Sequence, residues 1–489
     1  MFSFTARLSS TSVSEANDKS CYISRVIKRL DSLQLTIGLS VLFIIAHFIA
    51  AMFLCRERLF LDSSYYFFHV VNEESFRVEH QRIILAVSQV LLLAGVKMHL
   101  SLSVLLILYS VTPVILTAVL VFVSLYFFRS ESAALLIILS NVCGSYYLYY
   151  SPMYEVCYAV VIFGFLCLLT SRDYYMSRWQ TLLYSSVLLI CLFAYPLVVY
   201  GCIVLLIYHL VMAPRPSYRL ILIYLSAFVI WLAIKTIFIS DYEKGKISIP
   251  VREYPAVFTK IMSPDFIINA LKFLWLYYKE PLIALIVFLV VMFKQKRYAL
   301  GALAILSVSA FVGIVNFGYR GDGLIHSNNF ERMYLLLVPL CFAPVLYIIY
   351  PGISRPLKIL CVICVGMIAV YKSYGQWEHS RYYSSRIRSI DEMAAACTQR
   401  GCDKGAVDWG HLSHDLDEWS TGMEALIYSS EKGKSCIISD SAMVAKLKKG
   451  GLLDQDHFVL RLDEVMNINE LNPHYFKLSR SPYCQISAH

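Results

Sequence analysis

The sequence predicts a mostly α-helical fold: a polytopic transmembrane helical bundle of about eleven spans, followed by a small C-terminal α/β domain outside the membrane. Of the 489 residues, 58% are hydrophobic and 16% are charged, and the mean hydropathy of +0.61 exceeds that of soluble domains. Apolar runs long enough to cross a bilayer core of about 30 Å recur from residue 33 to residue 371. From residue 375 onward the chain is far more polar.

The N-terminal segment, residues 1–32, is polar and Ser-rich, and we expect it to be a cytoplasmic tail. The first apolar run, LQLTIGLSVLFIIAHFIAAMFL, has spanning length and follows the basic stretch RVIKRL. No small-residue cleavage site accompanies it, so it is predicted to be an uncleaved anchor.

Two interpretations of the next part compete, and the basic residues decide between them. If residues 82–96 crossed the membrane, Arg129, Arg172 and Arg178 would face outward, against the positive-inside rule. If they lie along the outer surface, nearly every basic loop faces inward. The second interpretation predicts spans near residues 33–54, 101–128, 133–150, 153–170, 181–195, 197–212, 220–238, 274–293, 299–317, 333–349 and 357–371.

The weakest part of this topology is the segment 181–212. We expect a short hairpin that turns at AYPLVVYG, where Pro196 removes a backbone donor. A single kinked helix would reverse everything downstream and turn the basic cluster KQKR outward, so the hairpin is preferred.

This topology divides the chain into a transmembrane module, residues 33–374, and a soluble periplasmic α/β domain, residues 375–489. The module opens with a long exoplasmic loop, residues 55–100, which has room for two surface helices. The tail alternates helix-like segments with strand-like runs, namely RIRSIDEMAAACTQRG, WSTGMEALIYSS and SAMVAKLKKGG with CIISD and HFVLRL.

Cysteines are consistent with an exterior tail. Of the 14 cysteines, nine fall in or beside apolar segments, and four fall in the tail: Cys397, Cys402, Cys436 and Cys484. An even number in an oxidising compartment suggests disulfides, with Cys397–Cys402 and Cys436–Cys484 as one pairing that spacing alone does not fix. A zinc site made from the same four is the alternative, although no C-x-x-C spacing is present.

Asp62 is the first candidate for a functional side chain. It follows the first apolar run within a few residues and precedes the pair Tyr65 and Tyr66. Ionisable groups at membrane depth are costly to bury and are therefore candidates for function. The alternative is structural, because in the stretch DSSY the carboxylate could cap the next helix by accepting backbone N–H bonds.

Glu155, in YYLYYSPMYEVCYAVV, is expected at the same outer boundary between two spans. An interfacial tyrosine belt with an incidental acid is the alternative. Two outward acids, each beside a tyrosine cluster, are more informative than one. Tyrosine faces stack against sugar rings, so the pattern is compatible with a shared carbohydrate site.

Basic residues follow in two motifs. RVEHQR contains His80 and Arg82, and YRGDGLIHSNNFER contains Arg320, His326 and Arg332. A phosphate group at a membrane surface needs such donors, and arginine offers bidentate geometry. The alternative for each is snorkelling to the headgroup layer.

Several activities lack their motifs. The sequence contains no Walker P-loop, no G-x-G-x-x-G after a strand, no H-E-x-x-H and no G-x-S-x-G. The formal charge of +9 is carried largely in short loops between spans, so no nucleic-acid partner is expected. Few charges are expected in mid-span, which gives an ion relay little support.

The arrangement resembles the C-type (GT-C) membrane glycosyltransferases. The matching features are Asp62 in FLDSSYYFF, the surface-helix segment 78–98, Glu155 in SPMYE and Arg332 in NNFERMYLLLVPL. The resemblance implies an inverting enzyme that moves a sugar from a polyprenyl-phosphate donor to a glycan or lipid-linked acceptor, with Asp62 as general base. It implies an inner-membrane protein with its catalytic face in the periplasm, of the kind that decorates O-antigen or lipopolysaccharide.

One departure from the family concerns metal. Some of its members hold a metal ion with paired acids, whereas here Ser64 stands two residues after Asp62, and Glu155 has no acidic partner two residues away. We therefore expect a metal-independent enzyme without a cofactor. The competing interpretations are an O-antigen polymerase or ligase, whose late exoplasmic loop is typically larger, and a lipid-linked sugar flippase, which predicts repeats and polar span interiors.

Overall fold

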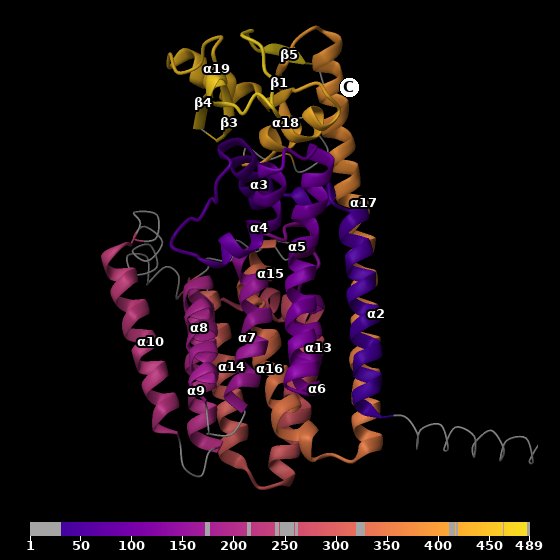
Figure 1. The fold of residues 1–489 in the computed structure, drawn as a ribbon, viewed down its shortest axis with the longest axis vertical. Helices are drawn as coiled ribbons and strands as arrows, with labels where there is room; N and C mark the ends of the chain where they lie inside the picture. The colour runs from indigo at the N-terminus through magenta and orange to yellow at the C-terminus, as the bar shows by residue number, and fades with distance from the viewer. Residues whose placement is uncertain are drawn as a thin grey trace, which may run out of the picture.

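The computed structural model describes residues 31–171, 177–212, 217–239, 263–318, 328–409, 416, 419–462 and 464–486, together with residues 244 and 259. The described chain is an elongated helical bundle with a small α/β region at one end (Figure 1). We refer to residues 400–489 as the C-terminal α/β region.

Seven helical stretches are long and apolar enough to cross a membrane, and all coincide with expected spans. Their helices include α2 (Ser32–Phe53), α5 (Leu102–Phe122) with η2 (Val123–Phe127), α10 (Tyr218–Ile237), α13 (Pro264–Lys294), α14 (Tyr298–Gly318), α15 (Asn328–Tyr334) with α16 (Leu337–Pro344), η4 (Val345–Ile349) and η5 (Tyr350–Gly352), and α17 (Arg355–Gln399).

The other four expected spans coincide with shorter apolar helices of 12 to 17 residues. The structure therefore supports a membrane protein with seven helices of spanning length, and the count of eleven stays an expectation. The shorter helices are α6 (Glu131–Val142), α7 (Glu155–Ser171), α8 (Arg178–Ala194) and α9 (Pro196–Met212).

The hairpin expected near Pro196 is present. Helix α8 ends at Ala194, Tyr195 is extended (φ −156°, ψ 136°), and α9 begins at Pro196 and packs back against α8. Proline suits the first position of a helix because the N–H it lacks would have no helical partner there. A single kinked helix is excluded.

Two helices lie in the first loop, as expected. They are α3 (Asp62–Glu73) and α4 (Ile84–Lys97), connected to α2 through η1 (Glu57–Leu59). Helix α4 has 14 residues, and a helix of that length is about 21 Å long. That is less than the bilayer core, as is also true of α6, α7, α8 and α9, so length alone does not distinguish a surface helix from a span here. In Figure 1, α3 lies between the bundle and the α/β region.

Helix α17 differs from the expectation of a boundary at residue 374. It runs without a break for 45 residues, about 68 Å, from the last expected span into the α/β region. Residues 375–399, which are polar enough to be assigned to the tail by composition, continue the same helix.

In the α/β region, two of the three expected helices (α18 and α19) and both expected strands (β2 and β3) are present, and β1, β4 and β5 were not expected. The third expected helix is the end of α17. Strands β1, β2 and β5 form a parallel sheet in the order β2-β1-β5, and β3 pairs antiparallel with β4. The elements are β1 (Lys404–Val407), α18 (Thr421–Glu431), β2 (Ile437–Asp440), α19 (Ser441–Lys449), β3 (His457–Arg461), β4 (Glu464–Asn467) and β5 (Cys484–Ile486).

The α/β region is docked on the bundle through charged and aromatic side chains. Arg56, directly after α2, pairs with Asp391 at 3.1 Å and with Glu431 at 3.3 Å. Its guanidinium also lies 4.7 Å from the ring centre of Tyr428. One arginine from the membrane part therefore contacts both α17 and α18.

Two charged side chains pair between α13 and α17, which is compatible with the expectation of few charges in mid-span. Lys372 of α17 and Glu280 of α13 form an ion pair at 2.8 Å. Pro281 leaves the Tyr277 carbonyl without its helical donor, and the Lys372 ammonium lies 3.4 Å from that oxygen. The pair therefore has a structural role at the kink of α13.

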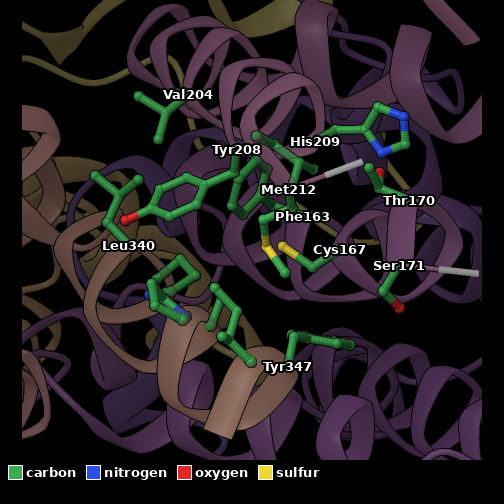
Figure 2. Close-up of a pocket in the computed structure, with 15 residues that line it drawn as sticks. Phe163, Cys167, Thr170, Ser171, Val204, Tyr208, His209, Met212, Leu340 and Tyr347 are labelled. Carbon is green, nitrogen blue, oxygen red and sulfur yellow. The ribbon is translucent and has the colours of Figure 1, made fainter. Parts of the chain in front are cut away.

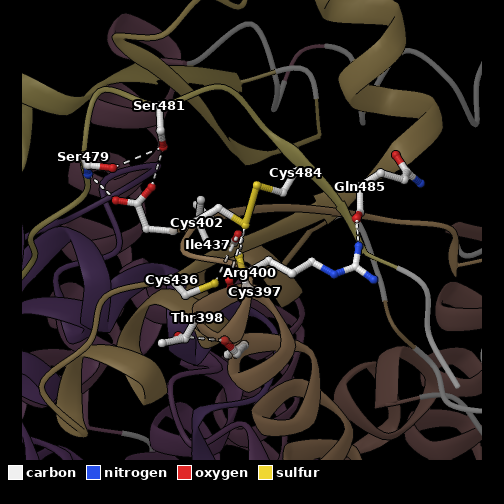
Figure 3. Close-up of a disulfide and its surroundings, with 12 residues drawn as sticks. Cys397, Thr398, Arg400, Cys402, Cys436, Ile437, Ser479, Ser481, Cys484 and Gln485 are labelled. Carbon is white, nitrogen blue, oxygen red and sulfur yellow. Dashed lines mark hydrogen bonds between the residues drawn. A yellow bond between two sulfur atoms is a disulfide. The ribbon is translucent and has the colours of Figure 1, made fainter.

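The disulfide pairing differs from the one suggested by the sequence. Cys402 is bonded to Cys484, with a Cα–Cα distance of 6.4 Å (Figure 3). The strand order explains why: Cys484 opens β5 on one side of β1, whereas Cys436 precedes β2 on the other side. Both suggested pairs, Cys397–Cys402 and Cys436–Cys484, are thus wrong, although the Cys397 sulfur lies 3.4 Å from that of Cys402.

Peptide mapping of the non-reduced protein should therefore recover a peptide pair joined through Cys402 and Cys484. Cys397 and Cys436 should be alkylated as free thiols in the same sample. The control is a reduced sample, in which the joined pair must disappear. Recovery of a link between Cys436 and Cys484 would contradict the strand order.

Candidate active site

Four charged side chains from separate segments meet at the end of the bundle that faces the α/β region. Arg82 pairs with Glu155 at 2.5 Å, and Arg332 lies 3.7 Å from Asp62. The two pairs are neighbours, since Asp62 is influenced electrostatically by both Glu155 and Arg82. The sequence singled out all four residues, and the structure brings them together.

Hydrogen bonds between two loops place Asp62 beside Glu155. The Phe60 N–H donates to the Tyr150 carbonyl at 3.3 Å, and the Ser151 hydroxyl donates to the Phe60 carbonyl at 2.8 Å. The first bond fixes the segment that leads into α3, and the second fixes the turn that leads into α7. Since the two helices begin with Asp62 and Glu155, the loops deliver both carboxylates to one place.

Strained backbone directly precedes two of the four residues. Leu61, before Asp62, has φ 53° and ψ −123°, and His80 and Gln81, before Arg82, have φ values of 53° and 55°. Non-glycine residues adopt such angles at a cost of about 1–3 kcal/mol each, and they cluster at functional sites.

The carboxylate of Asp62 does not act as the helix cap considered from the sequence. Helix α3 begins with Asp62 itself, Leu61 takes the cap position, and no side chain caps this end. Instead, the indole N–H of Trp419 donates to Asp62 Oδ1 at 3.0 Å. The structural alternative for Asp62 is therefore wrong, and its carboxylate is directed into the site.

The surroundings raise the pKa of Asp62. Burial has the largest effect and the Glu155 carboxylate adds to it, whereas Arg332, Trp419 and Arg82 oppose the shift. The Asp62 side chain keeps 28% of its surface exposed. A carboxylate with a raised pKa and an open side is a better proton acceptor at neutral pH than an ordinary one.

The two arginines retain unused hydrogen-bond donors. Among the described residues, the buried Nε–H groups of Arg82 and Arg332 have no hydrogen-bond partner. The Arg332 guanidinium lies 4.8 Å from the ring centre of Tyr154, and that of Arg82 lies 5.8 Å from Tyr195. The Nε–H groups of Arg56, Arg58 and Arg77 likewise lack a hydrogen-bond partner within the described chain, so this feature alone does not identify a ligand site; what it leaves is a donor that an acceptor such as a phosphate oxygen can use.

Other residues singled out from the sequence lie around this group or outside the described chain. Tyr66 is buried beside Glu155 and Asp62, and burial raises its pKa. The Tyr65 hydroxyl lies 2.5 Å from Glu79, and the His80 carbonyl accepts from Lys235 at 2.8 Å. Arg320 and His326 lie outside the described residues.

Two residues of the site were not recognised from the sequence. One is Trp419, which lies 357 positions after Asp62 and belongs to the α/β region. The other is Glu331, whose only signal was its position next to Arg332 at the start of a span. It is fully buried and accepts backbone N–H bonds from Tyr146, Tyr147 and Leu148, at 3.1, 2.8 and 3.0 Å.

Glu331 holds the segment that carries Arg332 against the loop that leads to Glu155. Its own carbonyl accepts from the Tyr278 hydroxyl at 2.9 Å, so both ends of the residue are fixed. Buried carboxylates are tolerated when several donors satisfy them, as here.

An apolar cavity of about 280 Å³ lies further along the bundle (Figure 2). Its walls come from α7, α9 and the stretch from α16 to η4. The lining includes Phe163, Val204, Leu340 and Pro344, and it is more polar at Ser171 and His209. Phe163 is the lining residue of α7 nearest to Glu155, and it lies about 12 Å from Glu155 along the helix axis.

Within the described part of the chain, no group of three or more His, Cys, Asp or Glu side chains is arranged to hold a metal ion. No protein family, curated protein or solved structure matches the chain.

Replacing Glu331 by Ala should destabilise the protein. Three buried N–H groups would lose their acceptor, and each unsatisfied group costs roughly 1–3 kcal/mol, so we expect a loss of about 3 kcal/mol or more. Glu331→Gln keeps one acceptor oxygen, so its loss of stability should be smaller than that of Glu331→Ala. Thermal unfolding of the purified protein in detergent measures the effect.

The matched control is Glu470→Ala, because Glu470 is exposed at the end of η7 (Ile468–Glu470). Its unfolding temperature should equal that of the wild type. An unchanged unfolding temperature for Glu331→Ala would contradict the role assigned to this carboxylate.

Proposed function

We propose that this protein is a membrane glycosyltransferase that moves a sugar from a polyprenyl-phosphate donor to a glycan or lipid-linked acceptor. The observation that carries the proposal is the meeting of Asp62 and Glu155 with Arg82 and Arg332 in one site at the end of a bundle with spanning helices. Carboxylates supply a base, guanidiniums bind phosphate, and the neighbouring aromatic rings suit a sugar.

The reaction is a single displacement. The acceptor hydroxyl approaches Asp62, which takes its proton as general base. The acceptor oxygen then forms a bond to the anomeric carbon while the bond from that carbon to the phosphate oxygen breaks. Polyprenyl phosphate leaves, and the anomeric configuration is inverted.

Arg332 neutralises the charge that grows on the leaving phosphate. Its unpaired Nε–H and its loose contact with Asp62 support this role, because both leave donors available to an incoming anion. Arg82 is bound more tightly by Glu155, so this second pair would orient the site and contact the sugar or the phosphate.

The proposed donor explains why the site is joined to spanning helices. Its isoprenoid tail needs an apolar surface, which helices of spanning length supply. The apolar cavity between α7, α9 and α16 lies in the same bundle, with none of the four site residues in its lining. Metal independence is part of the proposal: the Ser64 hydroxyl donates to the Leu61 carbonyl at 2.7 Å, and no acid stands there.

The proposed topology has eleven spans and follows from the positive-inside rule. It puts the site and residues 375–489, as a soluble domain, on the periplasmic side of the inner membrane. An O-antigen polymerase or ligase would instead make a chain, and a flippase would move the lipid without transfer. Product length and transfer in detergent, where no gradient exists, separate the three.

Asp62→Asn should abolish sugar transfer because an amide cannot accept the proton. We expect a loss of roughly 10²- to 10⁴-fold in kcat, with expression and gel-filtration profile intact. The assay uses detergent-solubilised protein, a panel of synthetic polyprenyl-phosphate hexoses and pentoses, and total envelope glycolipid as acceptor, and it follows released polyprenyl phosphate.

Asp265→Asn is the control, since Asp265 is exposed in the first turn of α13. It should transfer sugar at the wild-type rate. Wild-type turnover by Asp62→Asn would remove Asp62 from the role of base.

Arg332→Met should lower kcat by roughly 10²- to 10³-fold, because it removes a donor that stabilises developing charge. Arg332→Lys should lose less, since it keeps the charge but not the bidentate fork. Arg297→Met is the matched control because Arg297 is exposed, and this variant should keep the wild-type kcat. Wild-type activity in Arg332→Met would argue against phosphate binding by Arg332.

A further inference from the structure

Trp419 links the α/β region to the carboxylate of Asp62. Its indole N–H donates to Oδ1 at 3.0 Å, whereas Oδ2 is the oxygen that faces Arg332 at 3.7 Å. The two oxygens therefore have different surroundings: one accepts a hydrogen bond, and the other lies beyond hydrogen-bond distance of the guanidinium.

The indole ring of Trp419 contacts the guanidinium of Arg461. The Arg461 guanidinium lies 4.4 Å from the Trp419 ring centre and 3.9 Å from that of Tyr65. Arg461 itself is fixed by Glu464 at 2.6 Å. The guanidinium therefore joins a ring of the α/β region to a ring of α3.

The side chains that follow Trp419 are bound by a buried arginine of α17. Arg386, whose side chain is 2% exposed, donates to the hydroxyls of Ser420 and Thr421 at 3.3 and 3.2 Å and pairs with Glu424. It also lies 5.0 Å from the ring centre of Phe60. One guanidinium thus contacts the segment that precedes Asp62 and the segment that follows Trp419.

We propose that Trp419 is a positioning residue for the base, so that the α/β region completes the active site. The indole N–H holds Oδ1 of Asp62, and Oδ2 is thereby turned toward the acceptor hydroxyl and receives its proton. The inference rests on the proposed glycosyl transfer, and it assigns the C-terminal region a part in the chemistry.

The proposal predicts the direction in which Asp62 titrates when the indole N–H is removed. The groups that act on this carboxylate are Arg332, Arg82, Glu155 and the indole N–H, and the hydroxyls of Tyr66 and Tyr154 lie close enough to feel its charge. A donor to the ionised carboxylate stabilises the charged form, so its loss raises the pKa. Because the base must be ionised, the acid limb of the activity profile moves to higher pH.

Trp419→Phe is the variant of choice because it keeps an aromatic ring for Arg461 and loses only the N–H. Trp409→Phe is the matched control: Trp409 lies shortly after β1 in the same region, and its backbone N–H, which the substitution keeps, donates to Asp440 at 3.5 Å. Two readouts are needed, one of which does not depend on turnover.

The first readout is carbodiimide labelling of Asp62 as a function of pH, followed by mass spectrometry of the labelled peptide, since the reagent modifies protonated carboxyl groups. Trp419→Phe should shift the midpoint upward by about one pH unit, the size expected for a hydrogen bond to a charged group. The second is the pH profile of sugar transfer, whose acid limb should move by the same amount.

The proposal is overturned if Trp419→Phe titrates and transfers like the wild type, or if Trp409→Phe shifts both midpoints equally. A shift in labelling while even the wild type transfers no sugar would refute the proposed function, yet keep the link between Trp419 and Asp62. Transfer by the wild type with no shift in Trp419→Phe would refute the positioning role alone.

Discussion

The constraint on which the rest of the structure depends is the cost of keeping ionised groups in a largely buried site. Removing a carboxylate or a guanidinium from water costs several kcal/mol unless an opposite charge and hydrogen bonds compensate. Here Glu155 has Arg82, and Asp62 has Arg332 and an indole N–H. Each partner comes from a different segment, so the fold must bring distant parts of the chain together.

Supporting contacts satisfy that constraint by fixing backbone. Glu331 accepts three N–H bonds from the loop that leads to Glu155, and the Ser151 hydroxyl holds the carbonyl of Phe60 two residues before Asp62. Strained angles at Leu61 persist because such bonds over-determine the local conformation. Rigidity of this kind suits a site that must present a carboxylate in one orientation, because reorganisation during the reaction is then small.

Much of this could be predicted from the sequence, and the exceptions have a common origin. Helices of spanning length and the hairpin at Pro196 follow from local hydropathy and proline chemistry. Asp62 and Arg332 could be singled out because ionisable groups at membrane depth are costly to bury. Trp419 and the partner of Cys402 depend on docking and strand order instead. Neither contact leaves a local pattern in the sequence, so cysteine spacing suggested the wrong disulfides. Composition likewise suggested a domain boundary at residue 374, which lies inside the continuous helix α17.

Helix α17 has a consequence for how this chain can vary. Because it passes without a break from the last expected span into the α/β region, the two parts share one helical phase. A single residue added between them would turn the region by about 100° and move it by about 1.5 Å, which carries the indole away from its carboxylate. Seven added residues would nearly restore the angle but lift the region by about 10 Å. The length of this stretch is therefore as constrained as the identity of any side chain in the site.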